Sequence, residues 1–244
     1  MAAAVRALLC DLDDTLFDHA HASRCAIAEL YRAVPEFGCW SVDEFGDRHR
    51  EALEVMHLEV LAGRMSISVA RVERFRRLLA AASAPDPVDL APRIAGAYRG
   101  AYDIAWRAVP GALPLLRALK HAGIQTAIVT NNIVSEQRMK IDRCGFTAYV
   151  DALVTSEEVG VQKPGAEIFR TALERIGASP GEAVMLGDAW ATDIEGARGA
   201  GVRAVWLNRL GTPTRDPAVA ELRSLEPVED AMRVILETGD LVTW

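Results

Sequence analysis

Val5-Arg6-Ala7-Leu8-Leu9-Cys10 leads directly into Asp11-Leu12-Asp13-Asp14-Thr15-Leu16 near the start of the chain. The first half is a short, mostly apolar run, which predicts a buried β-strand, and three aspartates follow where that strand ends. In an open α/β sheet, ligands bind outside the carboxyl ends of the strands. The end of this strand is therefore a candidate functional site, and Asp11 and Asp13 are its first residues.

Asp11 and Asp13 stand two residues apart, where both side chains can turn toward one site as the backbone leaves the sheet. At an effective dielectric constant of about 20, two like charges about 4 Å apart repel by roughly 4 kcal/mol. A cation must compensate this repulsion, or one acid must keep its proton. Together these two solutions predict a metal-dependent mechanism with an acid/base carboxyl group. A calcium loop is excluded, because Leu16 stands where that motif needs glycine.

The composition is that of an ordinary globular protein. The 244 residues include 27 basic and 34 acidic side chains, and the resulting net charge of -7 argues against a nucleic-acid partner. No apolar run approaches the roughly 18 residues of a membrane helix, and the first residues lack the basic start of a signal peptide. The four cysteines show no C-x-x-C spacing. We therefore expect a cytoplasmic protein that binds neither a membrane nor nucleic acid.

The fold class follows from the spacing of the apolar runs. Five of them predict strands: Val5–Cys10, Gln125–Thr130, Val150–Thr155, Ala183–Gly187 and Val202–Leu207. Helical patterns separate the last four, and this alternation predicts an α/β fold with a doubly wound parallel sheet.

The first two predicted strands lie more than a hundred residues apart, which is too far for a structureless loop. The interval has helical patterns: Ser41-Val42-Asp43-Glu44 is a capping box, and further helices are expected from Ser66 and from about Leu90 to Trp106. We predict an inserted α-helical domain at residues 17–106. The core is then made of two segments, residues 1–16 and 107–244. Four arginines are expected on a solvated face of the inserted domain, where one could contact a substrate: Arg71, Arg74, Arg76 and Arg77.

The stretch from Asp11 to Leu16 resembles the first motif of the haloacid dehalogenase (HAD) superfamily, whose phosphatases carry D-x-D-x-T after the first strand. Further motifs follow in the family's order, at Ala127-Ile128-Val129-Thr130-Asn131, at Lys163-Pro164, and at Gly187-Asp188 with Asp193 five residues later. Four motifs in order across nearly the whole chain make a specific resemblance. It implies a Rossmann-like core with a helical cap domain inserted after the first strand.

The later motifs supply the groups that bind phosphate, neutralise the acid pair and complete a metal site. The hydroxyl of Thr130 and the next backbone N–H can hold a phosphate oxygen, and the Lys163 ammonium can neutralise carboxylates and phosphate together. Asp188 can reach the same ion as Asp11, and hard oxygen ligands with room for water suit Mg²⁺. Asn132 stands where the family more often has glycine, and asparagine is expected to preserve a left-handed turn there.

The resemblance implies hydrolysis of a small-molecule phosphate monoester in two steps. Asp11 attacks phosphorus and becomes an aspartyl phosphate, while Asp13 serves as the acid and then as the base. Mg²⁺ would be held by Asp11, the backbone carbonyl of Asp13 and Asp188, with Asp193 supporting from outside the ligand set. The residues expected to contact phosphate are Leu12, Asp13, Thr130, Asn131 and Lys163. The cap would close over the site and select the leaving group.

Related activities are partly excluded by single positions. Dehalogenases of the superfamily lack an acid at the place of Asp13, its transport ATPases have threonine there, and its phosphonate hydrolases need a cap lysine, which residues 17–119 lack. The segment Ala62–Ile67 with Arg74-Phe75 resembles the caps of nucleoside 5′-monophosphatases and N-acylneuraminate-9-phosphatases. It favours hydrolysis of a nucleotide or sugar phosphate. A phosphomutase and a non-catalytic binding protein with the same fold stay as alternatives, and the oligomeric state has no signal in the sequence.

Overall fold

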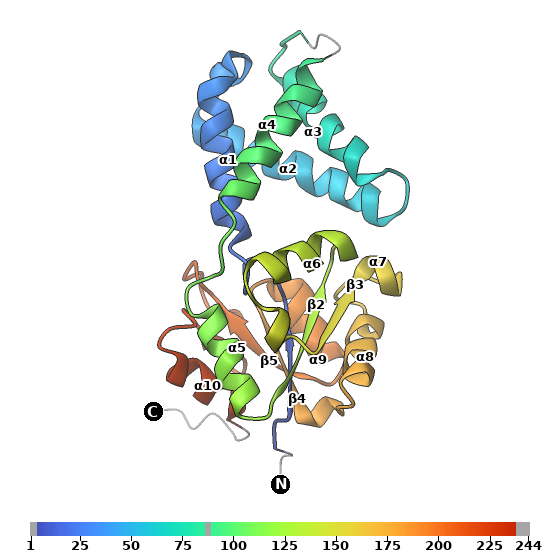
Figure 1. Ribbon diagram of the computed structural model, residues 1–244, viewed down its shortest axis with the longest axis vertical. Helices are drawn as coiled ribbons and strands as arrows, with labels where there is room; N and C mark the ends of the chain where they lie inside the picture. The colour runs from blue at the N-terminus through green and yellow to red at the C-terminus, as the bar shows by residue number, and fades with distance from the viewer. Residues whose placement is uncertain (1–3, 86–88, 238–244) are drawn as a thin grey trace. The chain divides into compact units, whose positions relative to one another are not determined.

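The computed structural model describes residues 4–85 and 89–237. The chain divides into two compact units, Met1–Asp18 with Arg107–Trp244 and His19–Trp106 (Figure 1). The sequence-based boundary, after residue 16, lies two residues before the first of these division points. No helix among the described residues combines the length and apolar character that a membrane crossing requires.

The first unit is built on a six-stranded sheet with the order β3-β2-β1-β4-β5-β6, in which every neighbouring pair is parallel. The strands are β1 Ala7–Cys10, β2 Gln125–Thr130, β3 Ala152–Thr155, β4 Ala183–Gly187, β5 Arg203–Leu207 and β6 Ala220–Leu222. The predicted fold class is confirmed, and the five predicted strands are all present. The sixth strand has only three residues, too few to give a periodic signal.

The central position of β1 fixes the place of the candidate site. β1 pairs with β2 on one side and with β4 on the other, and Cys10 lies level with Ile128 and Leu186. All four residues of β1 are buried, as expected for a strand covered on both faces. The strand order reverses beside β1, so the carboxyl ends of β1, β2 and β4 meet at a topological switch point, where open α/β sheets bind ligands.

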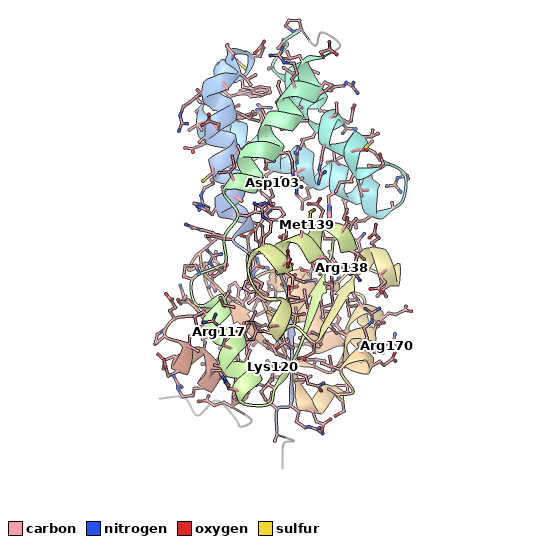
Figure 2. All side chains as sticks on the ribbon, in the orientation of Figure 1. Asp103, Arg117, Lys120, Arg138, Met139 and Arg170 are labelled. Atoms are coloured by element: carbon pink, nitrogen blue, oxygen red, sulfur yellow. The ribbon has the colours of Figure 1, made fainter. Side chains whose placement is uncertain are left out.

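Helices cover both faces of this sheet. They are α5 Ala112–His121, α6 Val134–Arg143, α7 Ser156–Val159, α8 Ala166–Arg175, α9 Glu195–Gly199 and α10 Val228–Leu236, with short 3-10 segments at Thr147–Tyr149 and Pro180–Glu182. Ala7 and Leu9 point into a cluster that includes Phe169 of α8, so alternate residues of β1 face opposite layers. Figure 1 shows α5 beside α10 and α8 beside α9. Arg117 and Lys120 of α5, labelled in Figure 2, reach the region before β3 by hydrogen bonds to Tyr149 and Asp151.

The second unit consists of α1 His19–Ala33, α2 Val42–Leu61, α3 Ile67–Ala81 and α4 Leu90–Ile104, with a 3-10 segment at Pro35–Cys39. Both expected helix starts are present. The Ser41 hydroxyl accepts the Glu44 N–H, which is one of the two hydrogen bonds of the predicted capping box, and the Ser66 hydroxyl accepts the Val69 N–H. α1 packs on α4, and α2 packs on α3. The helix α1 also packs on α2 and completes the bundle.

The predicted solvated arginine face of this unit is wrong for Arg74. Arg76 and Arg77 are exposed, whereas Arg74 is only 6% exposed. The reason is its position along α3, because Ala70, Arg74 and Leu78 follow one another at intervals of four residues and all three are buried. Periodicity therefore places Arg74 on the inner face, although its charge predicts the outer one.

Near the division points, a β-bridge and hydrogen bonds join the two chain segments of the first unit. Phe17 forms an antiparallel bridge with Ala108, and the buried Asp18 carboxylate accepts hydrogen bonds from Arg107 and Arg209. Burial raises the pKa of Asp18, but these hydrogen bonds outweigh it and hold the pKa below its ordinary value. Asp18 thus stays ionised and fixes the geometry of the segment that carries the first motif.

Candidate active site

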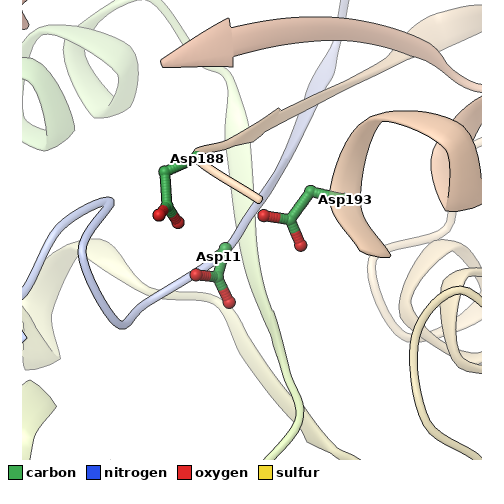
Figure 3. A group of neighbouring side chains, drawn as sticks. All are labelled: Asp11, Asp188 and Asp193. Carbon is green, nitrogen blue, oxygen red and sulfur yellow. The ribbon is translucent and has the colours of Figure 1, made fainter. Parts of the chain in front are cut away.

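Asp11 is the first residue after β1, and its carboxylate is almost fully buried. Its backbone N–H donates to the carbonyl of Leu186 in β4, and the residue is 7% exposed. Figure 3 shows Asp11 with Asp188 and Asp193, which come from the segment after β4. Carboxylate oxygens of these three residues lie within 4.8 Å of one another. The structure therefore brings together the acids of the first and fourth motifs.

Lys163 lies between two of these acids. Its Nζ donates to Oδ1 of Asp11 at 2.6 Å and to Oδ1 of Asp193 at 2.7 Å. Its backbone is anchored by Asn131, whose side-chain amide donates to the Lys163 carbonyl at 2.9 Å and accepts the Lys163 N–H at 2.7 Å. The Asn131 side chain therefore positions the backbone of Lys163, and the phosphate contact of Asn131 stays a prediction.

Asp193 supports the site from a fixed position. It is fully buried, and while Oδ1 accepts from Lys163, Oδ2 accepts the backbone N–H of Ala189 at 3.0 Å. A Cβ atom at Gly187 would lie 2.3 Å from this second oxygen, so the last residue of β4 must be glycine. Both oxygens of Asp193 thus have donors, which fits its predicted place outside a metal's ligand set.

The charges of this cluster do not balance. Burial raises the pKa of Asp11 well above its ordinary value, Lys163 opposes that shift, and Asp193 and Asp188 add to it by repulsion. Burial also raises the pKa of Asp188 to about 7, with further contributions from Asp193 and Asp14. Burial lowers the pKa of Lys163, but Asp11 and Asp193 outweigh burial and raise it, so the ammonium stays charged. One cation faces three acids, of which Asp11 and Asp193 are buried and Asp188 is partly exposed.

This surplus of negative charge, carried by hard carboxylate oxygens, fits a divalent cation such as Mg²⁺. Asp11 and Asp188 are the acids placed to hold it, and the Thr15 hydroxyl orients Asp188 by donating to Oδ1 at 3.2 Å. The residues present therefore match the predicted metal site.

Asp13 points to a separate group of partners. Lys140 Nζ donates to its Oδ1, and Gln137 Nε2 donates to its Oδ2 at 2.9 Å. Both partners come from α6, three residues apart and so on one face of the helix, and both are buried. Neither residue was predicted from the sequence. Two features could have indicated them, namely their i, i+3 spacing and the scarcity of lysine, since the chain has only three.

Thr130 joins this second group. It is the last residue of β2, is 2% exposed, and its hydroxyl oxygen accepts from Gln137 Nε2 at 2.7 Å. The expectation of a left-handed backbone at Asn132 is wrong, because the described non-glycine residues with positive φ are Asp14 and Ser83. Instead, the Asn132 side chain accepts the N–H of the next residue at 2.8 Å and donates to Asp13 at 3.4 Å.

Leu12 can act only through its backbone. Its side chain is fully buried, and its carbonyl accepts the N–H groups of Leu16 at 3.0 Å and Phe17 at 2.8 Å. This tight turn, with Asp14 at a φ of 63°, carries the chain out of the sheet. As a result, Asp11 and Asp13 leave the strand toward different partners.

The model of the haloacid dehalogenase-like hydrolase family matches residues 5–201. The chain belongs to this family. The resemblance predicted from the sequence is therefore confirmed, as is the enzyme class.

One relative matches nearly the whole chain, and a second matches less than half of it. Ribulose-1,5-bisphosphate 5-phosphatase of Halopiger xanaduensis is 32% identical, over 97% of this chain and 99% of that protein. Pyrimidine 5'-nucleotidase YjjG of Escherichia coli is 41% identical over a shorter match, 41% of this chain and 44% of that protein. The crystal structure of the HAD-hydrolase YfnB of Bacillus subtilis, bound to magnesium, is similar in fold, with a TM-score of 0.75. The sequence identity is 23%, and the match covers 96% of this chain and 99% of YfnB. The two named relatives are both phosphatases.

The raised pKa of Asp188 gives a prediction for stability. The ordinary pKa of an aspartate is 3.8 and that of Asp188 is about 7, so between these values the folded chain binds more protons than the unfolded chain. Its free energy of unfolding must then fall as the pH rises through this window. In EDTA, we expect Asp188→Asn to raise the free energy of unfolding by about 1–3 kcal/mol at pH 8 and by little at pH 4.

Urea unfolding at the two pH values measures this difference. Glu174→Gln, at an exposed position of α8, is the matched control and should show no pH-dependent gain. A destabilised Asp188→Asn protein at pH 8, or an equal gain at both pH values, would contradict the charge imbalance.

Proposed function

We propose that the protein is a Mg²⁺-dependent phosphatase that hydrolyses a small-molecule phosphate monoester through an aspartyl phosphate on Asp11. The observation that carries this proposal is that two neighbouring acids each form an ion pair with a different buried lysine. Asp11 is bound by Lys163, and Asp13 is bound by Lys140. Identical side chains two residues apart thus have different surroundings, as a nucleophile and an acid/base require.

In the first step, an Asp11 carboxylate oxygen attacks phosphorus, and the bond from phosphorus to the leaving oxygen breaks. Asp13 gives its proton to that oxygen, so the product leaves as an alcohol. Lys163 stays next to Asp11 and stabilises charge on the phosphoryl oxygens. The hydroxyl of Thr130 and the backbone N–H groups at the strand ends would hold the same oxygens.

In the second step, Asp13 removes a proton from water, and the resulting nucleophile attacks phosphorus of the aspartyl phosphate. The bond from phosphorus to Asp11 breaks, which restores the carboxylate and releases inorganic phosphate. When bound by Asp11, the Asp13 carbonyl and Asp188, Mg²⁺ would supply charge stabilisation to the phosphoryl oxygens. Asp193 takes no part in the transfer and keeps Lys163 in place.

Hydrolysis is favoured over phosphomutase chemistry because the two named relatives are phosphatases. We further propose that the helical unit His19–Trp106 acts as the cap that selects the leaving group, and that the enzyme works in the cytoplasm on a sugar phosphate or a nucleoside monophosphate.

Removal of divalent metal tests the proposal directly. With p-nitrophenyl phosphate as substrate, EDTA should abolish turnover and added Mg²⁺ should restore it. Asp188→Asn should raise the Mg²⁺ concentration needed for half-maximal activity by about tenfold or more, because one carboxylate ligand is lost. Glu174→Gln should behave like the wild type. Full activity in metal-free protein would rule out the proposed site.

Lys140 should affect how well Asp13 protonates the leaving group. Lys140→Met removes the ion pair that orients Asp13, so we expect kcat to fall by about 10- to 100-fold for an alkyl phosphate, with little change in KM. The loss should be smaller for p-nitrophenyl phosphate, since its leaving group needs less protonation. Lys140→Arg should recover part of the activity.

Lys120→Met is the control for this comparison, because Lys120 forms an exposed ion pair with Asp151 on the outside of α5. It should leave both substrates unaffected. Equal losses for the alkyl and aryl substrates in Lys140→Met, at the chemical step, would show that Lys140 does not act through Asp13.

A further inference from the structure

Arg74 of α3 is a buried cation for which the structure shows no counter-charge. It is 6% exposed, no hydrogen bond or ion pair reaches it from the described residues, and its Nε is a buried donor without an acceptor. Other arginines of the same unit have carboxylate partners, such as Arg48 with Glu44 and Arg99 with Asp103. An unpaired buried guanidinium is strongly unfavourable, so a protein that keeps one has a use for it.

Aromatic rings hold the guanidinium in place. Its central carbon lies 4.7 Å from the ring centroid of Tyr98 and 5.0 Å from that of Phe75. Contacts of this kind stabilise the cation through the ring face and leave its N–H edge to bind an acceptor. Tyr98 and Phe75 also contact each other, at a centroid distance of 5.6 Å, so they form one support.

A second buried polar group touches the same two rings. The His49 ring of α2 lies 4.6 Å from Tyr98 and 5.7 Å from Phe75, and His49 Nε2 also lacks a hydrogen-bond partner in the described chain. Burial lowers the pKa of His49 well below its ordinary value, and Arg74 lowers it further. His49 is therefore neutral at physiological pH and offers one donor without adding charge.

Two further polar contacts of this cluster join hydroxyl and imidazole groups. The Tyr98 hydroxyl lies 3.1 Å from the Ser23 hydroxyl, and the Tyr102 hydroxyl lies 2.7 Å from Nδ1 of His19. The neighbouring groups that shift the pKa of Arg74 are Tyr98, Tyr102 and Arg71, and none of them is a carboxylate. All four helices thus contribute to a site with net positive charge.

We propose that Arg74 and His49, supported by Phe75 and Tyr98, form a binding site within the helical unit for the anionic group, a carboxylate or a phosphate, of a small organic molecule. The planar guanidinium matches two oxygens of such a group by paired hydrogen bonds. The anionic group can belong to one of two molecules. It is either a second acidic group on the leaving group of the substrate, in which case the inference rests on the proposed function, or it is part of a separate small molecule.

The first arm of the test compares substrate pairs that differ in one acidic group. O-phosphoserine is paired with O-phosphoethanolamine, and ribulose 1,5-bisphosphate with ribulose 5-phosphate. If the anion belongs to the substrate, the ratio of kcat/KM within a pair should fall by about 10- to 100-fold in Arg74→Met. Arg74→Lys, which keeps the charge and loses the paired donors, should give an intermediate ratio. Arg48→Met, at an exposed ion pair, should keep the wild-type ratio.

The second arm measures binding without turnover. If the anion is a separate molecule, succinate should raise the unfolding temperature of the wild type and of Arg48→Met, and this shift should be lost in Arg74→Met. Arg74→Met should itself unfold at a higher temperature than the wild type, because it removes an unpaired buried cation.

Either arm alone supports the anion site. Unchanged ratios together with an unchanged succinate effect in folded Arg74→Met and Arg74→Lys would overturn it and leave Arg74 as a cation that only packs on aromatic rings. A wild type that hydrolyses no phosphate monoester in Mg²⁺ would refute the proposed function instead, and the succinate arm would still test the anion site.

Discussion

The contact of one lysine with two buried aspartates is the interaction on which the candidate site depends. Lys163 joins Asp11, at the end of β1, to Asp193, beyond the end of β4. Without the ammonium, these acids and Asp188 would repel one another in a buried setting, where such repulsion is strongest. Even with it, the pKa of Asp188 stays raised to about 7. The site is therefore stable enough to form and still deficient in positive charge, a condition that favours binding of a cation.

The central parts of this arrangement could be predicted from the sequence because they are local. A parallel strand buried on both faces is a continuous apolar run, and the acids follow at its end. The helix start at Ser41 is signalled within four residues, and the Ser41 hydroxyl caps the helix by accepting the Glu44 N–H. The contact between Lys140 and Asp13 was not predictable in this way. It joins residues 127 positions apart and depends on which face α6 turns toward β1.

The corrections share one cause, which is that residue type and position gave opposing signals. At Arg74 the charge indicates the surface, but the helical spacing places the residue on the buried face. At Asn132 the residue type indicates a left-handed turn, but its side chain bonds the next N–H and fixes another backbone shape. Both departures from the expected pattern put polar groups where a ligand can use them, next to Asp13 in one case and inside the helical unit in the other.

Trapping of the covalent intermediate tests most directly whether Asp11 is the nucleophile. Asp13→Asn protein, in which hydrolysis of the intermediate is slowed, is mixed with p-nitrophenyl phosphate and Mg²⁺, quenched, and reduced with borohydride. Reduction converts an acyl phosphate to an alcohol, so the peptide containing residue 11 should carry homoserine there after substrate has been added, and aspartate without substrate. The Asp11→Asn protein should carry only asparagine at this position under either condition. Unmodified aspartate at position 11, while p-nitrophenol is released in a burst, would contradict the assignment of Asp11 as the nucleophile.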